Sequence, residues 1–276
     1  MNYRHAYHAG NFADVHKHVA LVAVLLSLRR KESPFAVIDT HAGRGLYDLS
    51  AEASQRTREA SDGIELLRDH AAQSPALAAY LEIVGDFDAQ HYPGSPLIAA
   101  RLLRPQDRLV AIEKQPEEYD ALRSALSPFP KVRAISGNGY LQLPILLPPA
   151  ERRGVVLIDP PYEQEYELQQ IAKIFGVAHR RFTTGIYLIW QPLKNASSAG
   201  ALADEIRNAG ATKLLSLVLD VGRAPEDPVG KLSASGLLVV NPPYGFDAEM
   251  RAAGAEILLR RGTGASTRVE WLAGGP

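Results

Sequence analysis

The sequence predicts an α/β fold: a Rossmann-like, mostly parallel sheet of seven strands, doubly wound by helices, with a helical insertion. Two observations support this prediction. Short apolar runs that end in a polar residue recur along the 276 residues, as expected of strands that are buried on both faces. Segments with apolar residues at helical spacing lie between most of these runs, and this alternation is typical of a doubly wound sheet.

The composition limits the class of protein. Hydrophobic residues make up 46% of the chain and charged residues 22%, which fits an ordinary globular protein. Because cysteine is absent, disulfides, thiolate catalysis and cysteine-based zinc sites are excluded. No apolar run reaches about 18 residues and the first residues do not resemble a signal peptide, so we expect a cytoplasmic protein without membrane contact. The net charge of −1 argues against a broad basic surface for nucleic acid, but not against a local basic patch.

The chain begins with an arm, a helix and a strand. Residues 1–18 hold four of the eight histidines together with tyrosines and cations, so this arm is basic and aromatic. We expect Asp14 to cap a helix over 15–31, which Pro34 closes. The run 35–39 predicts a buried strand that ends in a carboxylate and leads into a glycine-containing turn.

The next segment, 50–104, shows helical patterns and no strong strand signal. The expected helices span 60–73, 75–87 and 95–104. We therefore predict a helical insertion subdomain over 50–104, within a main domain formed by 1–49 and 105–276.

The rest of the chain alternates between the two patterns. Strands are expected at 108–113, 131–136, 154–159, 184–190, 213–219 and 235–241, and helices at 116–127, 164–180 and 199–210. A loop rich in Gly and Pro, without a helical pattern, joins the last two strands. We therefore expect these two strands to form an antiparallel pair at one edge of the sheet.

Polar residues follow the first three strands, where a doubly wound sheet binds its ligands. His41, Gly43 and Gly45 follow the first strand, and the glycines either let the backbone approach a ligand or form a plain tight turn. Glu113 ends the second strand, where a carboxylate can hold the hydroxyls of a ribose or be a solvated charge. Asn138 follows the third strand, either to pair with an adenine edge or as part of a bare turn.

The strongest signal is the tetrapeptide Asp159-Pro160-Pro161-Tyr162 at the end of a buried strand. The prolines restrict the backbone, so the Asp159 carboxylate and the carbonyls of residues 159–160 present a fixed set of acceptors. Such a set suits the two N–H groups of an exocyclic amine on a planar base, and Tyr162 supplies a ring for stacking. We therefore predict catalytic roles for Asp159, Pro160 and Tyr162.

Two other patterns predict no chemistry. A second tetrapeptide, Asn241-Pro242-Pro243-Tyr244, follows the last strand. Because that strand is expected to be antiparallel, its end should lie at the opposite edge from the ligand crevice, so we interpret the tetrapeptide as structural. The histidines form no His-x-x-x-His pattern with a nearby Glu, so we expect no metal.

Taken in order, the glycine turn, the acid of the second strand and Asp-Pro-Pro-Tyr resemble an S-adenosylmethionine-dependent amino-methyltransferase. One family is similar essentially from end to end: the bacterial RlmJ-type enzymes, which methylate adenine N6 in 23S ribosomal RNA. The segments that carry this resemblance are YRHAYHAGNFADVHKH, IDTHAGRGLYDL, HYPGSPLIAARLLR, LIDPPYE, FTTGIYLIWQP and SASGLLVVNPPY. The resemblance implies S-adenosyl-L-methionine as the cofactor and 23S ribosomal RNA as the partner.

The resemblance also implies roles for individual residues. It puts these residues on cofactor-binding positions, Asp159 being catalytic as well: His18, His41, Ser95, Glu113, Asn138, Gly139 and Asp159. Lys17 and Gly43 complete the predicted cofactor set. The relative considered has Asp where this chain has Asn138, and an amide still offers a carbonyl to the adenine amino group of the cofactor.

Tyr3 falls on a position implicated in contact with RNA. We expect the arm, with Tyr3, Arg4 and His5, to bind RNA beside the target adenine. The alternative is that the arm only packs against the cofactor pocket.

The predicted function is therefore methyl transfer to adenine N6 in 23S ribosomal RNA by a monomeric enzyme. Two alternatives stay open, namely a DNA adenine-N6 methyltransferase and a non-catalytic RNA-binding protein on a methyltransferase scaffold. A glutamine-modifying methyltransferase would instead require the tetrapeptide at 241–244 to face the cofactor.

Overall fold

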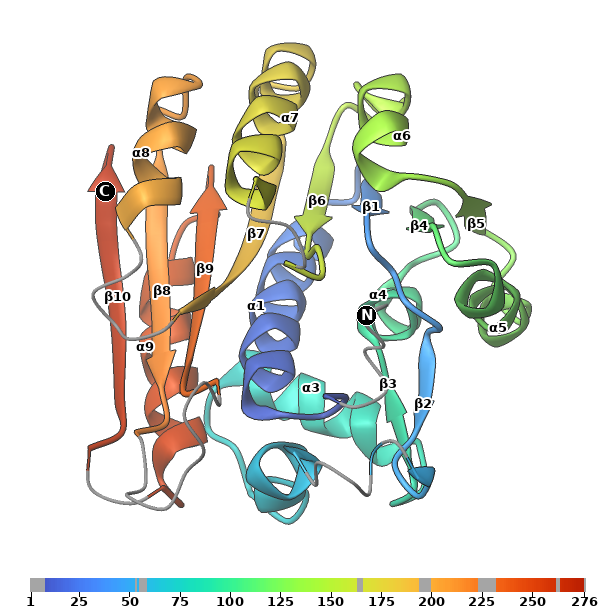
Figure 1. The fold of residues 1–276 in the computed structure, drawn as a ribbon, viewed down its shortest axis with the longest axis vertical. Helices are drawn as coiled ribbons and strands as arrows, with labels where there is room; N and C mark the ends of the chain where they lie inside the picture. The colour runs from blue at the N-terminus through green and yellow to red at the C-terminus, as the bar shows by residue number, and fades with distance from the viewer. Residues whose placement is uncertain are drawn as a thin grey trace.

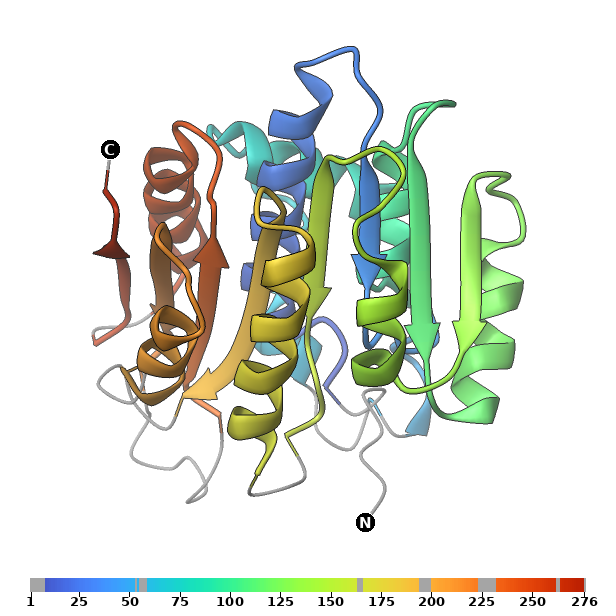
Figure 2. The same cartoon turned by 90° about the horizontal axis from the view of Figure 1, so that it is seen from above.

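The computed structural model describes residues 8–52, 54, 59–162, 166–193, 200–222, 232–261 and 264–275. An eight-stranded sheet lies at its centre, between two layers of helices (Figure 1 and Figure 2). In order across the sheet, the strands are β10 (Ser266–Ala273), β8 (Leu214–Asp220), β9 (Ala234–Val240), β7 (Ile186–Leu193), β6 (Gly154–Ile158), β1 (Ala36–Asp39), β4 (Arg108–Glu113) and β5 (Val132–Ser136).

The strand directions create a ligand crevice beside β1. Strands β5, β4, β1, β6 and β7 are parallel, whereas β9 is antiparallel to both of its neighbours, β7 and β8. The predicted antiparallel pairing of the last two expected strands is thus confirmed. Because β1 has β4 on one side and β6 on the other, the strand order reverses there, and the carboxyl ends of these three strands flank a crevice.

The sheet has eight strands, so the predicted number of seven is wrong. The additional strand, β10, pairs antiparallel with β8 and forms the edge that we expected the β8–β9 pair to form. Its exposed and half-buried residues alternate, because α9 covers one of its faces and the other is open to solvent. A search for continuous apolar runs does not detect such an alternating strand.

Helices cover both faces of the sheet (Figure 2). One face carries α1 (Phe12–Arg29), α3 (Pro75–Gly85), α4 (Ser95–Leu102), α5 (Pro116–Leu126) and α9 (Phe246–Leu258). The other carries α6 (Gly139–Leu146), α7 (Glu167–Arg181) and α8 (Gly200–Asn208). The sequence analysis missed α6 and α9. No helix in the ranges that the structure describes is long and apolar enough to cross a membrane.

Helix α1 is buried almost all round, since it lies between the sheet and α3, α4 and α9. It begins earlier than predicted. Asn11 is its N-cap, and the side-chain oxygen of Asn11 accepts a hydrogen bond from the backbone N–H of Asp14. Asp14 therefore lies in the first turn and is not the cap, which leaves its carboxylate available to other partners.

The segment between β1 and β4 is less helical than predicted. Helices α3 and α4 form as expected, but 60–73 contains only two short 3-10 turns, at Glu59–Asp62 and Ile64–Leu66. Gly63 packs against the residues before α1, and a Cβ at this position would lie 2.0 Å from the carbonyl oxygen of Gly10. A small two-stranded sheet of β2 (Leu46–Asp48) and β3 (His91–Pro93) was also not predicted.

Candidate active site

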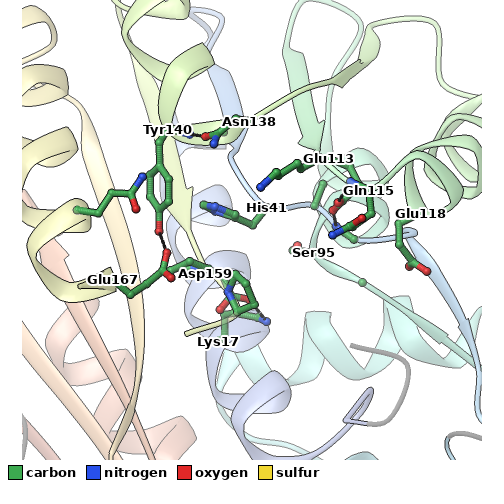
Figure 3. A pocket seen from close by; sticks show the side chains of 18 of the residues that line it. Lys17, His41, Ser95, Glu113, Gln115, Glu118, Asn138, Tyr140, Asp159 and Glu167 are labelled. Carbon is green, nitrogen blue, oxygen red and sulfur yellow. Dashed lines mark hydrogen bonds and ion pairs between the residues drawn. The ribbon is translucent and has the colours of Figure 1, made fainter. Parts of the chain in front are cut away.

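A cavity of about 320 Å³ opens at the carboxyl edge of the parallel strands (Figure 3). This volume is within the range of small-molecule sites, roughly 300–1,000 Å³. The cavity brings together all nine residues that were predicted to bind cofactor, and Pro160 as well. These residues are Lys17, His18, His41, Gly43, Ser95, Glu113, Asn138, Gly139 and Asp159.

Helix α1 supplies a buried cation to the cavity wall. The Nζ atom of Lys17 donates to Asp14 Oδ1 at 2.8 Å and to Asp159 Oδ2 at 2.5 Å. Burial lowers the pKa of Lys17, but the two carboxylates outweigh burial and hold this pKa well above its ordinary value. Lys17 therefore stays charged and connects α1 to the end of β6, across 142 positions in the sequence.

His18, the next residue, is fixed by tyrosines of the insertion. Its Nδ1 lies 2.7 Å from the hydroxyl of Tyr92, which in turn lies 3.0 Å from the hydroxyl of Tyr80. The His18 and Tyr92 rings are stacked with centroids 5.8 Å apart. These contacts hold the imidazole at the cavity wall.

The turn after β1 contacts the end of β4. The backbone N–H of Gly43 donates to Glu113 Oε2 at 2.9 Å, and that of Gln115 donates to Oε1 at 2.7 Å. Burial raises the pKa of Glu113, and these N–H groups oppose the shift. Gly43 has a φ of 61°, which suits glycine, and a Cβ there would lie 2.1 Å from the Tyr47 hydroxyl.

His41 stands between the two sides of the cavity (Figure 3). Its ring meets that of Tyr140 edge to face, with centroids 4.9 Å apart, and its Nδ1 lies 2.9 Å from Thr40 Oγ1. Burial, with a smaller contribution from the charge of Lys114, lowers the pKa of His41 to about 3. His41 is therefore neutral at physiological pH.

Asp39 lies beneath the cavity, almost completely buried at the end of β1. Ser95 Oγ donates to its Oδ2 at 2.6 Å, and the His41 backbone N–H donates to its Oδ1 at 3.3 Å. Burial raises the pKa of Asp39 to about 6, although the Ser95 hydrogen bond opposes this. The folded state thus keeps a proton that the unfolded chain has already lost, and stability falls as the pH rises from about 4 to about 6.

We expect Asp39→Asn to stabilise the protein by on the order of 2 kcal/mol at pH 8, and by less at pH 5. The amide oxygen keeps an acceptor for Ser95 and gives up the longer bond from the His41 N–H, while the variant no longer bears the cost of ionising a buried carboxyl. Urea unfolding of both proteins at the two pH values measures this difference. An equal effect at pH 5 and pH 8 would contradict the raised pKa of Asp39.

Asn138 has a second task that the sequence analysis did not foresee. Its Oδ1 accepts from the backbone N–H groups of Tyr140 and Leu141, at 2.9 and 3.4 Å, and so caps helix α6. The amide Nδ2 is left to face a ligand. The expectation that Asn138 offers its carbonyl to an adenine amino group therefore needs revision, because in this geometry the side chain presents a donor.

The Asp159 motif begins directly after β6. Lys17 donates to Oδ2 of Asp159. Among the residues that the structure describes, Oδ1 of Asp159 has no hydrogen-bond partner. Tyr162 is not part of the cavity lining. Its hydroxyl donates to the Trp190 carbonyl oxygen, and its ring meets the Trp190 indole edge to face at 5.6 Å.

Several cavity residues were missed by the sequence analysis: Tyr140, Tyr166, Glu167 and Gln170. Tyr140 donates its hydroxyl to Glu167 Oε1 at 2.5 Å, so a second carboxylate lies on the Asp159 side of the cavity (Figure 3). Glu167 starts α7, and an acid in the first turn is the signal that could have identified it. Tyr140 carries no comparable signal.

Two further sets of residues were singled out by the sequence analysis. Tyr3, Arg4 and His5 fall outside the described residues. Asn241 follows β9, whose antiparallel direction puts it at the opposite edge, where its Nδ2 donates to the carbonyl oxygens of Thr183 and Gly185. The predicted position of the second tetrapeptide, away from the cavity, is confirmed. Within the described ranges, no three His, Asp or Glu side chains gather as metal ligands.

Comparison with known proteins adds independent information to this geometry. A family model described as ribosomal RNA large subunit methyltransferase D, RlmJ, matches residues 32–273. The chain belongs to this family. Among curated relatives, ribosomal RNA large subunit methyltransferase J of Escherichia coli is 37% identical, and that of Haemophilus influenzae is 38% identical. Each alignment covers 99% of both chains, so the predicted RlmJ resemblance is confirmed.

Solved structures agree with the predicted Rossmann-like fold. The crystal structure of a Legionella pneumophila protein has a TM-score of 0.86 and 32% identity, and the match covers 95% of this chain and 98% of that one. A probable spermidine synthase of Corynebacterium glutamicum has a TM-score of 0.51 at 12% identity, covering 97% and 78% of the two chains, and shares the fold alone.

Proposed function

We propose that this RlmJ-family protein transfers a methyl group from S-adenosyl-L-methionine to N6 of an adenine in 23S ribosomal RNA. The observation that carries the proposal is the position of Asp159. Its carboxylate faces a small-molecule cavity at the switch point of the sheet, next to a rigid Pro-Pro segment and opposite Glu113.

The cavity residues fit this cofactor. Glu113 Oε2 accepts the Gly43 N–H and Oε1 accepts the Gln115 N–H, and a carboxylate of this kind at the cavity wall suits the two hydroxyls of a ribose. The Asn138 amide can donate to an adenine ring nitrogen, and the carboxylates of Asp159 and Glu167 favour a cationic centre. Lys17, His18, His41, Gly43, Ser95 and Gly139 form the rest of the binding surface. When bound, S-adenosyl-L-methionine supplies an electrophilic methyl group on a sulfonium.

Asp159 and Pro160 then activate the target amine. Adenine N6 is a weak nucleophile, because its lone pair is delocalised into the ring. The free Oδ1 of Asp159 and a carbonyl oxygen of Asp159 or Pro160 accept the two N6–H bonds, which localises the lone pair and aims it at the methyl group. Lys17 keeps the carboxylate in place, and Asp159 accepts the departing proton. The adenine must leave its stack to reach this site, and Tyr162 provides an aromatic surface beside it.

Glu113→Gln is expected to weaken cofactor binding by about tenfold or more. The amide retains the shape but replaces charge-assisted hydrogen bonds, which contribute about 1.5–3 kcal/mol each, with neutral ones. Calorimetric titration with S-adenosyl-L-methionine measures the effect. An unchanged dissociation constant would remove Glu113 from the cofactor site.

We propose that the N-terminal arm binds the RNA through Tyr3, Arg4 and His5. Its base is anchored, because His8 Nδ1 lies 2.8 Å from Glu59 Oε1 and Asn11 Nδ2 donates to Glu59 Oε2. Tyr3→Ala should reduce RNA methylation much more than cofactor affinity, since a stacked aromatic contributes about 1–3 kcal/mol. Titration of both ligands tests this. Equal losses for cofactor and RNA would favour packing of the arm against the pocket instead.

The proposal also covers the segment 50–104 and the state in which the protein acts. Residues 50–104 form an insertion subdomain, and Glu249 and Glu256 of α9 anchor the start of its helix α3 by accepting the backbone N–H groups of Ala76 and Ser74. The protein acts as a monomer in the cytoplasm.

The decisive experiment compares substrates. Purified protein is incubated with labelled S-adenosyl-L-methionine and either protein-free 23S ribosomal RNA or duplex DNA, and the methylated adenine is located by mass mapping. We expect methylation of the RNA. Methylation of DNA alone would support the alternative enzyme, and a failure to bind cofactor would support the non-catalytic one.

A further inference from the structure

A buried serine connects three elements behind the cavity. Ser235, near the start of β9, is inaccessible to solvent. Its Oγ lies 3.0 Å from Nδ1 of His16 on α1 and 3.0 Å from Nε1 of Trp190 on β7. Because β9 is antiparallel to β7, its first residues lie at the same edge of the sheet as the cavity.

The groups involved fix the direction of one of these hydrogen bonds. An indole N–H can only donate, so Ser235 Oγ accepts from Trp190. Burial lowers the pKa of His16 to about 3, so its ring is neutral. In the tautomer with the proton on Nε2, His16 Nδ1 accepts the serine proton, and in the other tautomer Nδ1 donates to the second lone pair of Ser235 Oγ. In either tautomer the serine hydroxyl joins His16 to Trp190.

Trp190 and His16, the two partners of Ser235, are each connected to the Asp159–Tyr162 loop. The Trp190 carbonyl oxygen accepts the Tyr162 hydroxyl, and the two rings are in edge-to-face contact. On the other side, His16 precedes Lys17, which holds Asp159. The aromatic and the acidic end of the Asp-Pro-Pro-Tyr loop are thus both joined to the Ser235 hydroxyl, one through β7 and one through α1.

We propose that His16, Ser235 and Trp190 are positioning residues that fix the orientation of the Asp159–Tyr162 loop. The inference rests on the proposed function, since it assigns a task in the methyl-transfer step to residues outside the cavity. In a near-attack geometry, a small displacement of the acceptors around adenine N6 lowers the rate without removing any binding contact.

The test replaces single polar groups and separates rate from binding. Ser235→Ala removes the shared hydroxyl, and Trp190→Phe keeps a ring while removing the indole N–H. We expect each variant to lower the single-turnover rate of RNA methylation tenfold or more, with the dissociation constant for S-adenosyl-L-methionine changed less than twofold. Ser235→Thr, which retains the hydroxyl, should recover most of the rate. Ser216→Ala is the matched control, because Ser216 is a buried serine of the neighbouring strand β8.

Fluorescence gives a readout that does not depend on activity. The chain has two tryptophans, so Trp271→Phe leaves Trp190 as the single reporter. In this background, Ser235→Ala should shift the Trp190 emission, whereas Ser216→Ala should not. If Ser235→Ala matches Ser216→Ala in rate and emission, or weakens cofactor binding as much as it lowers the rate, the positioning role is wrong. If the unmodified protein fails to methylate RNA, the proposed function is wrong, while the emission shift still reports the contact.

Discussion

Asp159→Ala is expected to lower methyl transfer at least a hundredfold while the fold and most of the cofactor affinity persist. Removal of a preorganised hydrogen-bonding group at a reacting centre typically costs about 10²–10³ in rate. Asp159 Oδ1 is the acceptor that we propose for the target amine, and the variant leaves the Glu113 side of the cavity intact. Single-turnover methylation of 23S ribosomal RNA, paired with calorimetric binding of cofactor, measures the two effects separately.

Asn241→Ala is the matched control, because Asn241 starts the second tetrapeptide. Its Nδ2 supports carbonyl oxygens at the beginning of β7, so its loss should cost stability at most. Near-normal turnover in Asp159→Ala would remove Asp159 from catalysis. A rate loss in folded Asn241→Ala as large as that of Asp159→Ala would show that the second tetrapeptide has a catalytic task.

Lys17→Met is expected to destabilise the protein by about 3–5 kcal/mol, the usual cost of removing one partner of a buried ion pair. The variant leaves the Asp14 carboxylate buried without its cation, and it also removes the cation that pairs with Asp159. Lys17 attracts the ionised form of Asp14, so the deficit of the variant relative to the unmodified protein should grow as the pH rises and Asp14 ionises.

Urea unfolding at pH 5 and pH 8 tests this prediction, and the deficit relative to the unmodified protein should be smaller at pH 5. In the unmodified protein, the raised pKa of Lys17 contributes stability that is fully present below about pH 10.4 and is lost only above it. The double variant Asp14→Asn with Lys17→Met should recover much of the loss, because it no longer buries the Asp14 carboxylate without the Lys17 cation beside it. A deficit below 1 kcal/mol in Lys17→Met, or no recovery in the double variant, would show that the pair is not stabilising.

Much of the fold could be predicted from the sequence, because strands buried on both faces read as apolar runs. The same property located the strand ends, and therefore Glu113 and Asp159. The short connection before β9 was sufficient to predict its direction, and so to separate the Asp159 tetrapeptide from the one at Asn241. Two of the missed elements have a weaker local pattern, since strand β10 is half exposed and the short helix α6 contains Pro144.

The sequence by itself thus determined seven of the eight strands of the sheet, the place of the crevice and the predicted cofactor-binding residues that line it. Only the tertiary structure decided how these residues are held. The ion pair of Lys17 with Asp159 and the contacts of His16 and Trp190 with Ser235 join positions 142, 219 and 45 residues apart. Local periodicity reports which face of an element is buried, but not which side chain of another element it meets. That choice depends on how helices and strands pack, and packing has no signature in a single segment of chain.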